Sequence, residues 1–83
     1  MQITNGIDAI PTVNALEARA RALNLHLRRV CELAGTDYSL VYRWQRKGVV
    51  PLLNNFRRVT GLIEAKLDEL EVEMADRINR KAS

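Results

Sequence analysis

The chain has 83 residues, 47% of them hydrophobic and 28% charged, and its net charge of +3 is typical of one small globular domain. Cys31 is the only cysteine and His26 the only histidine, which excludes an internal disulfide and leaves too few soft ligands for a zinc site. No apolar run reaches the length of about 18 residues that a membrane span needs, and no secretory signal opens the chain, so we expect a cytoplasmic protein without a membrane partner.

An arm, either loose or an ordered extension, and a first helix are predicted for the amino-terminal part. Residues 1–11 show neither a helical nor a strand periodicity. A helix is predicted to begin near Thr12 or Asn14, because Asn14 and Glu17 have the spacing of a capping box. Asn24 is suited to a left-handed residue that ends this helix. Its apolar face consists of Leu16, Ala20 and Leu23.

Two short helices joined by a turn follow. The first fits residues 27–34 and ends at Gly35, which adopts a positive φ without steric cost. The second fits residues 38–46, with Asp37 as its N-cap. A small residue is needed where two such helices cross closely, and Cys31 provides it. Together with the inward-facing apolar residues, these spacings indicate a helix-turn-helix. The inward-facing residues are Val30, Val41 and Trp44, and Ala34 is the small residue needed just before the turn.

The carboxyl-terminal part is predicted to be helical as well. Pro51 suits the first turn of a fourth helix, which is expected to reach about Thr60. Gly61 either separates this helix from a fifth or lies inside one long helix, where it costs about 1 kcal/mol. Beyond it, apolar residues recur at the 4-3-4 spacing of paired helices. We predict that this stripe in residues 62–83 pairs with a second copy; the alternative is that it folds back over its own domain. The stripe consists of Ile63, Leu67, Leu70 and Met74.

These elements predict an all-α fold of four or five helices, and residues 16–61 resemble the lambda-repressor-like family of Cro, phage repressors and related small regulators. The stretch 46–51 (RKGVVP) is similar to that family's loop before its fourth helix. The sequence departs from the family at Leu27, where glutamine is frequent, and at Thr36, where an aliphatic residue is usual. The shared pattern of a small residue, a glycine, an aliphatic and an aromatic residue is met by Cys31, Gly35, Val41 and Trp44.

The resemblance implies that residues 12–61 bind DNA and that residues 38–46 enter the major groove. The fork of Arg43 matches the two acceptors of guanine and makes it the best candidate for base reading. The base-reading set is Tyr38, Ser39, Tyr42 and Arg43. Contacts to phosphates are expected from residues around the motif. These are His26, Arg28, Arg46, Lys47 and Asn54.

The distribution of charge agrees with a polyanionic partner for the body of the chain. Nine basic and four acidic residues precede residue 62, whereas four basic and six acidic residues follow from there. The prediction is therefore a phage-like transcriptional regulator, a repressor in type, that binds a palindromic operator in double-stranded DNA as a homodimer and is associated with the bacterial nucleoid.

Two other functional classes are compatible with the same pattern. One is a protein-interaction module, such as an adaptor, an inhibitor or an antitoxin subunit. The other is a non-specific DNA binder of the nucleoid type. An enzyme is not expected, because the sequence shows no paired carboxylates, no nucleophile–base set and no phosphate-binding glycine loop. For the same reason we expect neither a cofactor nor a small-molecule ligand.

Overall fold

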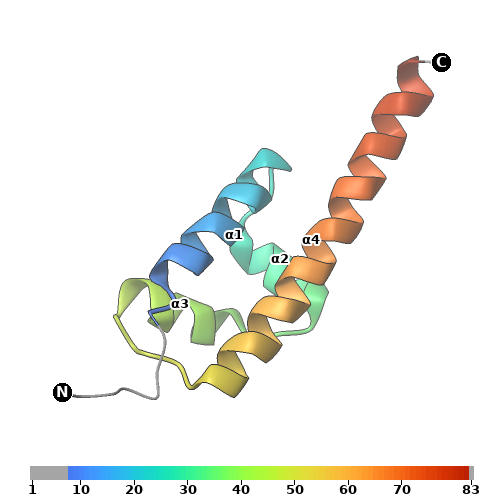
Figure 1. The fold of residues 1–83 in the computed structure, drawn as a ribbon. Coiled ribbons are helices and arrows are strands. Elements are labelled where there is room, and N and C mark those ends of the chain that lie inside the picture. The colour runs from blue at the N-terminus through green and yellow to red at the C-terminus, as the bar shows by residue number, and fades with distance from the viewer. Residues whose placement is uncertain (1–7, 83) are drawn as a thin grey trace.

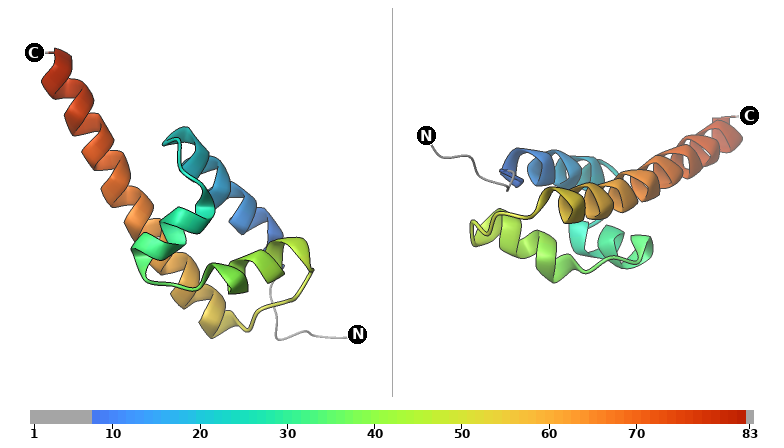
Figure 2. Two further views of the ribbon diagram at one scale, coloured as in Figure 1. Left: turned by 180° about the vertical axis from the view of Figure 1, so that it is seen from behind. Right: turned by 60° about the horizontal axis from the view of Figure 1, so that its bottom comes forward.

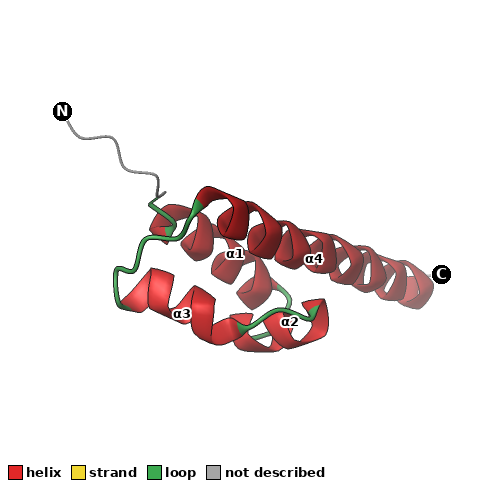
Figure 3. Cartoon of the chain, turned by 90° about the horizontal axis from the view of Figure 1, so that it is seen from below, coloured by secondary structure: helices red, strands yellow, loops and turns green. Residues whose placement is uncertain are grey.

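The computed structural model describes residues 8–82, and for residues 81 and 82 it describes the backbone alone. Within this range the chain is all-helical, as predicted, and contains no β-strand. Four helices make up the fold: α1 (Ile10–Ala22), α2 (Leu27–Ala34), α3 (Tyr38–Arg46) and α4 (Leu53–Ala82). They form two layers, with α1 and α4 in one layer and α2 and α3 in the other (Figures 1 and 3).

Helix α1 begins earlier than its sequence suggests. Its first residue is Ile10, whose backbone N–H donates to Oδ1 of Asp8 at 3.2 Å, so the capping role predicted for Asn14 is wrong. Ala9 is buried in the core. The expected arm therefore ends before Ala9, and the rest of it, residues 1–7, lies outside the described range.

The bounds of α2 and α3 and the turns around them follow the sequence signals. Asn24 ends the first helical segment with a φ of 61°, and Gly35 ends α2 with a φ of 77°. Asp37 caps α3, because its Oδ1 accepts a hydrogen bond from the backbone N–H of Ser39 at 2.9 Å. These local interactions satisfy helix-end groups that would otherwise remain unpaired. They fix the short connection between α2 and α3.

One core joins all four helices. The ring of Trp44 on α3 lies 6.2 Å from that of Phe56 on α4, which brings the two helices together at this end. Cys31 is fully buried, and burial raises the pKa of its thiol to about 11, so it remains an unreactive, protonated packing group. The core consists of Ala9, Val13, Leu16, Ala20, Leu27, Val30, Cys31, Val41, Trp44, Val59, Ile63 and Leu67.

Helix α4 is one continuous helix of 30 residues, so of the two alternatives for Gly61 the single long helix holds, and the expected start at Pro51 is two residues too early. Gly61 lies inside it. The first half of α4 packs in the core, whereas its last turns project beyond the other helices (Figures 1 and 2). Charged residues recur along its length, and among the described helices none is both long and apolar enough to cross a membrane.

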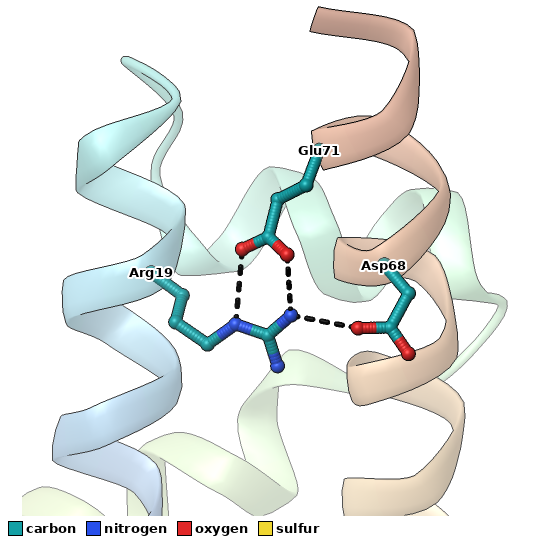
Figure 4. A network of polar contacts seen from close by, with 3 residues as sticks. All are labelled: Arg19, Asp68 and Glu71. Atoms are coloured by element: carbon teal, nitrogen blue, oxygen red, sulfur yellow. Dashed lines mark hydrogen bonds and ion pairs between the residues drawn. The ribbon is translucent and has the colours of Figure 1, made fainter. Parts of the chain in front are cut away.

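A three-residue ion cluster fastens α1 to α4 (Figure 4). Arg19 on α1 donates from Nε and Nη2 to the two carboxylate oxygens of Glu71, at 3.0 and 2.8 Å, and from Nη2 to Asp68 at 2.8 Å. These hydrogen bonds hold the pKa of Arg19 above its ordinary value and that of Glu71 below its own. A bidentate contact between an arginine and a carboxylate, as between Arg19 and Glu71, is the strongest form of ion pair. The cluster lies where α4 leaves the core.

Candidate nucleic-acid interface

Helix α3 has one face inside the domain and one face outside. Val41 and Trp44 are buried, while Ser39 and Arg43 are exposed and Tyr42 is 41% exposed. Helices α1 and α4 lie on one side of α3, and no described helix lies on the opposite side (Figure 3). A short helix anchored on one side and bare on the other has the shape that the major groove, about 12 Å wide, admits.

The two tyrosines of α3 lie in different environments. Tyr38 is half-buried and packs against the core, so it is less accessible than the other three residues of the predicted base-reading set. Its ring lies 6.1 Å from that of Tyr42, and the two rings are tilted by 53°. Tyr38 therefore supports Tyr42 from the core side, and Tyr42 presents the more exposed ring of the pair.

The hydroxyl of Ser39 is already engaged at the start of α3. It donates to Oδ1 of Asp37 at 2.6 Å, and the same oxygen accepts from the backbone N–H of Ser39. These bonds, together with the positive charge of Arg43, lower the pKa of Asp37. In this arrangement the Ser39 hydroxyl can accept a hydrogen bond from a base but has no proton left to donate. Its predicted part in base reading is therefore limited to that of an acceptor.

The predicted basic residues at the end of α3 are exposed and lie close together in its last turn and at its C-cap. Arg43 and Arg46 lie in the last turn, and Lys47 is the C-cap. The N–H groups of Lys47 and Val49 both donate to the carbonyl oxygen of Arg43, which makes a compact end to the helix. Basic side chains here also stabilise the negative end of the helix dipole, so their positions serve the fold as well as a polyanion.

The start of α2 supplies the second basic region. His26 stands at the N-cap position with extended backbone and makes no side-chain cap, while Arg28 and Arg29 are exposed. Glu32 lies 3.8 Å from Arg28 and 3.2 Å from Arg29, and so partly neutralises them. Residues at the beginnings of α2 and α3 line one surface depression. It is lined by Glu17, His26, Leu27, Arg28, Arg29, Glu32 and Tyr38.

Asn54 is exposed in the first turn of α4, after the loop that follows α3 (Figure 1). It does not line the depression that joins the beginnings of α2 and α3. The structure thus groups His26 and Arg28 near Tyr38, whereas Asn54 stands on a different element.

Gln45, which lies outside the predicted set of site residues, holds α3 against α1. Its Nε2 donates to Oδ1 of Asn14 at 2.8 Å and to Oε1 of Glu17 at 3.1 Å. These are the two residues predicted to form a capping box; they instead hold α3 against α1. The amide oxygen of Gln45 is buried without a hydrogen-bond partner. The contacts span 28 and 31 residues, so no local spacing announces them.

The predicted pairing stripe of α4 divides into two parts. Ile63 and Leu67 are 0% exposed inside the chain's own core, so the prediction that these two contact a second copy is wrong. Leu70 and Met74 are half-buried and line a groove beside α2. The alternative, folding back over the domain, holds for the first two positions because α1 and α2 cover this stretch of α4.

The described residues contain no group of three or more side chains that could hold a metal ion. Comparison with protein-family models, with curated proteins and with solved structures finds no match to this chain. The function proposed below therefore rests on the arrangement of its residues.

Proposed function

We propose that the chain is a sequence-specific DNA-binding regulator that places the outer face of α3 in the major groove. One observation carries the proposal: Tyr42 and Arg43 are exposed on α3 while Val41 and Trp44 anchor its opposite face in the core. The exposed basic residues at the start of α2 and the end of α3 lie at the two ends of the same unit. This arrangement suits contacts to phosphates on both sides of a groove.

The exposed groups suggest a role for each residue in base reading. Arg43 donates its fork to the O6 and N7 acceptors of guanine. Tyr42 packs its ring on a thymine methyl, and Ser39 accepts a hydrogen bond, since its own proton is held by Asp37. Tyr38 keeps the ring of Tyr42 in place.

The remaining basic residues bind the DNA backbone in this proposal. Lys47 and Arg46 extend from the end of α3, and His26 and Arg28 from the start of α2. Such contacts give affinity and register without sequence information. The protein would act by occupying its operator, as a repressor does, and its proposed function requires only binding.

The test begins with selection of bound sequences from random DNA, followed by affinity measurements on the selected site and on scrambled DNA. Arg43→Ala should lose about 1–3 kcal/mol of discrimination at one base pair. Arg43→Lys is the matched control, because it keeps the charge and removes the planar fork. It should bind scrambled DNA as the wild type does and still discriminate poorly.

Lys47→Ala provides the contrasting variant. It should weaken binding to all sequences alike and reduce the slope of the log–log salt dependence by about 1. A selection that returns no common sequence would contradict sequence-specific binding and favour a non-specific DNA binder. A chain that shows no salt-dependent DNA binding would favour a protein-interaction module.

A further inference from the structure

An apolar groove of about 280 Å³ lies on the side of the molecule where α4 leaves the core. The loop after α1, the helix α2 and the helix α4 contribute its walls. Leu33 on α2 is 40% exposed beside it, although it is a large apolar residue. The apolar walls are Leu23, Leu25, Leu33, Leu70 and Met74.

The same helix carries an apolar side chain that fits such a groove. Ile78 is 60% exposed and follows Met74 by four residues, which is about one helical turn. The last turns of α4, to which this residue belongs, project beyond the other helices (Figures 1 and 2). A groove and a matching projection on one surface are what a two-fold symmetric pair of identical chains requires.

The charges along α4 select the direction of pairing. Residues 64–76 contain six acidic residues and one lysine, whereas residues 77–81 contain three basic residues and no acidic one. Two parallel helices would set acidic against acidic and basic against basic. Two antiparallel helices set the basic end of each beside the acidic part of the other, which is electrostatically favourable.

We infer that a second copy of this chain packs antiparallel against the end of α4, with Ile78 of each copy in the groove of the other. In this register the two-fold axis passes between Met74 and Ala75, so Ile78 comes close to Leu70 of the partner subunit and Arg77 of one copy faces the partner's Glu73. Glu73 and Arg77 both border the groove, so each symmetric pair closes one rim of it. The surface differs from the predicted seam, since Ile63 and Leu67 take no part.

The pairing also sets the distance between two DNA-reading helices, and this consequence rests on the proposed function. Phe56 packs beside Trp44 of α3, and about 28 Å of helix separates it from Ala75 at a rise of 1.5 Å per residue. The two Phe56 side chains are then about 60 Å apart along the paired helices. This is nearer to two turns of B-DNA than to one turn of about 34–36 Å. Half-sites about 20 base pairs apart are expected.

Sedimentation of the full chain without DNA tests the pairing independently of the proposed function. The wild type should be dimeric at tens of micromolar, and Ile78→Glu should weaken dimerisation on the order of tenfold or more. Val72→Glu is the matched control, because Val72 is 67% exposed on the same helix and does not border the groove. It should remain dimeric. A monomeric wild type, or a dimeric Ile78→Glu variant, would overturn the inference.

The rim charges provide a rescue experiment. Arg77→Glu and Glu73→Arg should each weaken the dimer, and the double variant should restore it, because the exchange recreates both pairs across the interface. Circular dichroism on the same samples separates loss of pairing from loss of helix. A double variant no better than the single ones would contradict the contact between Arg77 and the partner's Glu73.

Oxidative cross-linking of two single-cysteine variants tests the direction. In an antiparallel pair, Leu70→Cys and Ile78→Cys form a mixed disulfide with each other, and neither variant efficiently cross-links with itself. Parallel helices would give the reverse pattern and would refute the proposed register. Cys31 does not interfere, because it is fully buried and its pKa is raised. If cross-linking succeeds but selection finds no DNA site, the pairing stands and the DNA-binding proposal fails.

Discussion

The two halves of α4 carry one continuous apolar stripe and yet have different surroundings. Ile63 and Leu67 are completely covered by the chain's own helices, whereas Leu70 and Met74 are half-buried and Ile78 is exposed. The spacing of the apolar residues does not change between the halves. What changes is the neighbour, because α1 and α2 end and α4 continues (Figure 2).

The difference between the two halves of α4 shows what a helical periodicity determines. It identifies the face of the helix that avoids water, since residues three and four apart share one side. It does not identify the surface that covers this face, which depends on where the other helices end. The predicted pairing stripe therefore combined two environments, and the boundary lies between Leu67 and Leu70.

The largest expected effect separates the halves directly. Ile63→Ala should destabilise the fold by about 2–5 kcal/mol, because it removes a fully buried side chain and leaves a cavity. Ile78→Ala is the matched control in the same helix and should change unfolding much less. Both are measured by chemical denaturation at a protein concentration low enough for monomers. If the parent does not survive Ile63→Ala, Ile63→Val should still cost about 0.5–1.5 kcal/mol. Equal losses at both isoleucines would remove the distinction.

A smaller effect is expected at the junction of the halves, where Arg19 holds Glu71 and Asp68. The pKa of Glu71 is lowered in the folded chain, so this contact stabilises the fold above the unfolded carboxyl pKa of about 4.3. The contribution is lost as the pH falls through the folded pKa. Arg19→Ala should therefore lower the melting temperature at pH 7 and make little difference in acid.

The control for this experiment is Arg21→Ala. Arg21 lies on the same helix but is 72% exposed, with Glu17 at 3.8 Å, and such surface pairs contribute little. A constant difference between wild type and Arg19→Ala from pH 7 to pH 2 would show that the guanidinium acts by packing alone. In that case the junction would not depend on its charges.

The smallest effect tests whether both halves form one rigid rod. Gly61→Ala should raise stability by up to about 1 kcal/mol, since Gly61 is helical and, apart from the backbone of its own helix and its two chain neighbours, no atom lies within 4 Å of an added Cβ. Gly35→Ala makes the contrast: its φ of 77° strains any other residue, so stability should fall. Thermal unfolding followed by circular dichroism measures both. A loss of stability in Gly61→Ala would indicate that α4 bends at this position.

Local signals predicted the parts of the fold that local interactions determine. The bounds of α2 and α3 agree with the sequence because Gly35 and Asp37 act within a few residues of their own position. The start of α1 was missed because Asp8, and not Asn14, meets the first free N–H. The continuity of α4 could not be decided from sequence, since the intrinsic preference of Gly61 is small compared with the packing on either side.

For the candidate site as well, only the features that depend on local spacing could be predicted from the sequence. The outward positions of Tyr42 and Arg43 follow from helical periodicity once Val41 and Trp44 are known to face inward. The engagement of the Ser39 hydroxyl depends on a rotamer, which spacing does not reveal. The groove beside α4 depends on residues far apart in the chain, because Leu23 and Met74 meet there only after folding.

Helix α1 contributes no residue to the proposed base-reading face, yet it sets the geometry of the molecule. Through Arg19 it holds the root of the projecting end of α4, and through Asn14 and Glu17 it holds Gln45 on α3. Helix α3 and the projecting end of α4 are therefore both positioned by contacts with α1. A substitution in α1 that breaks one of these contacts would change the angle between the outer face of α3 and the axis of α4, although no residue on either surface is altered.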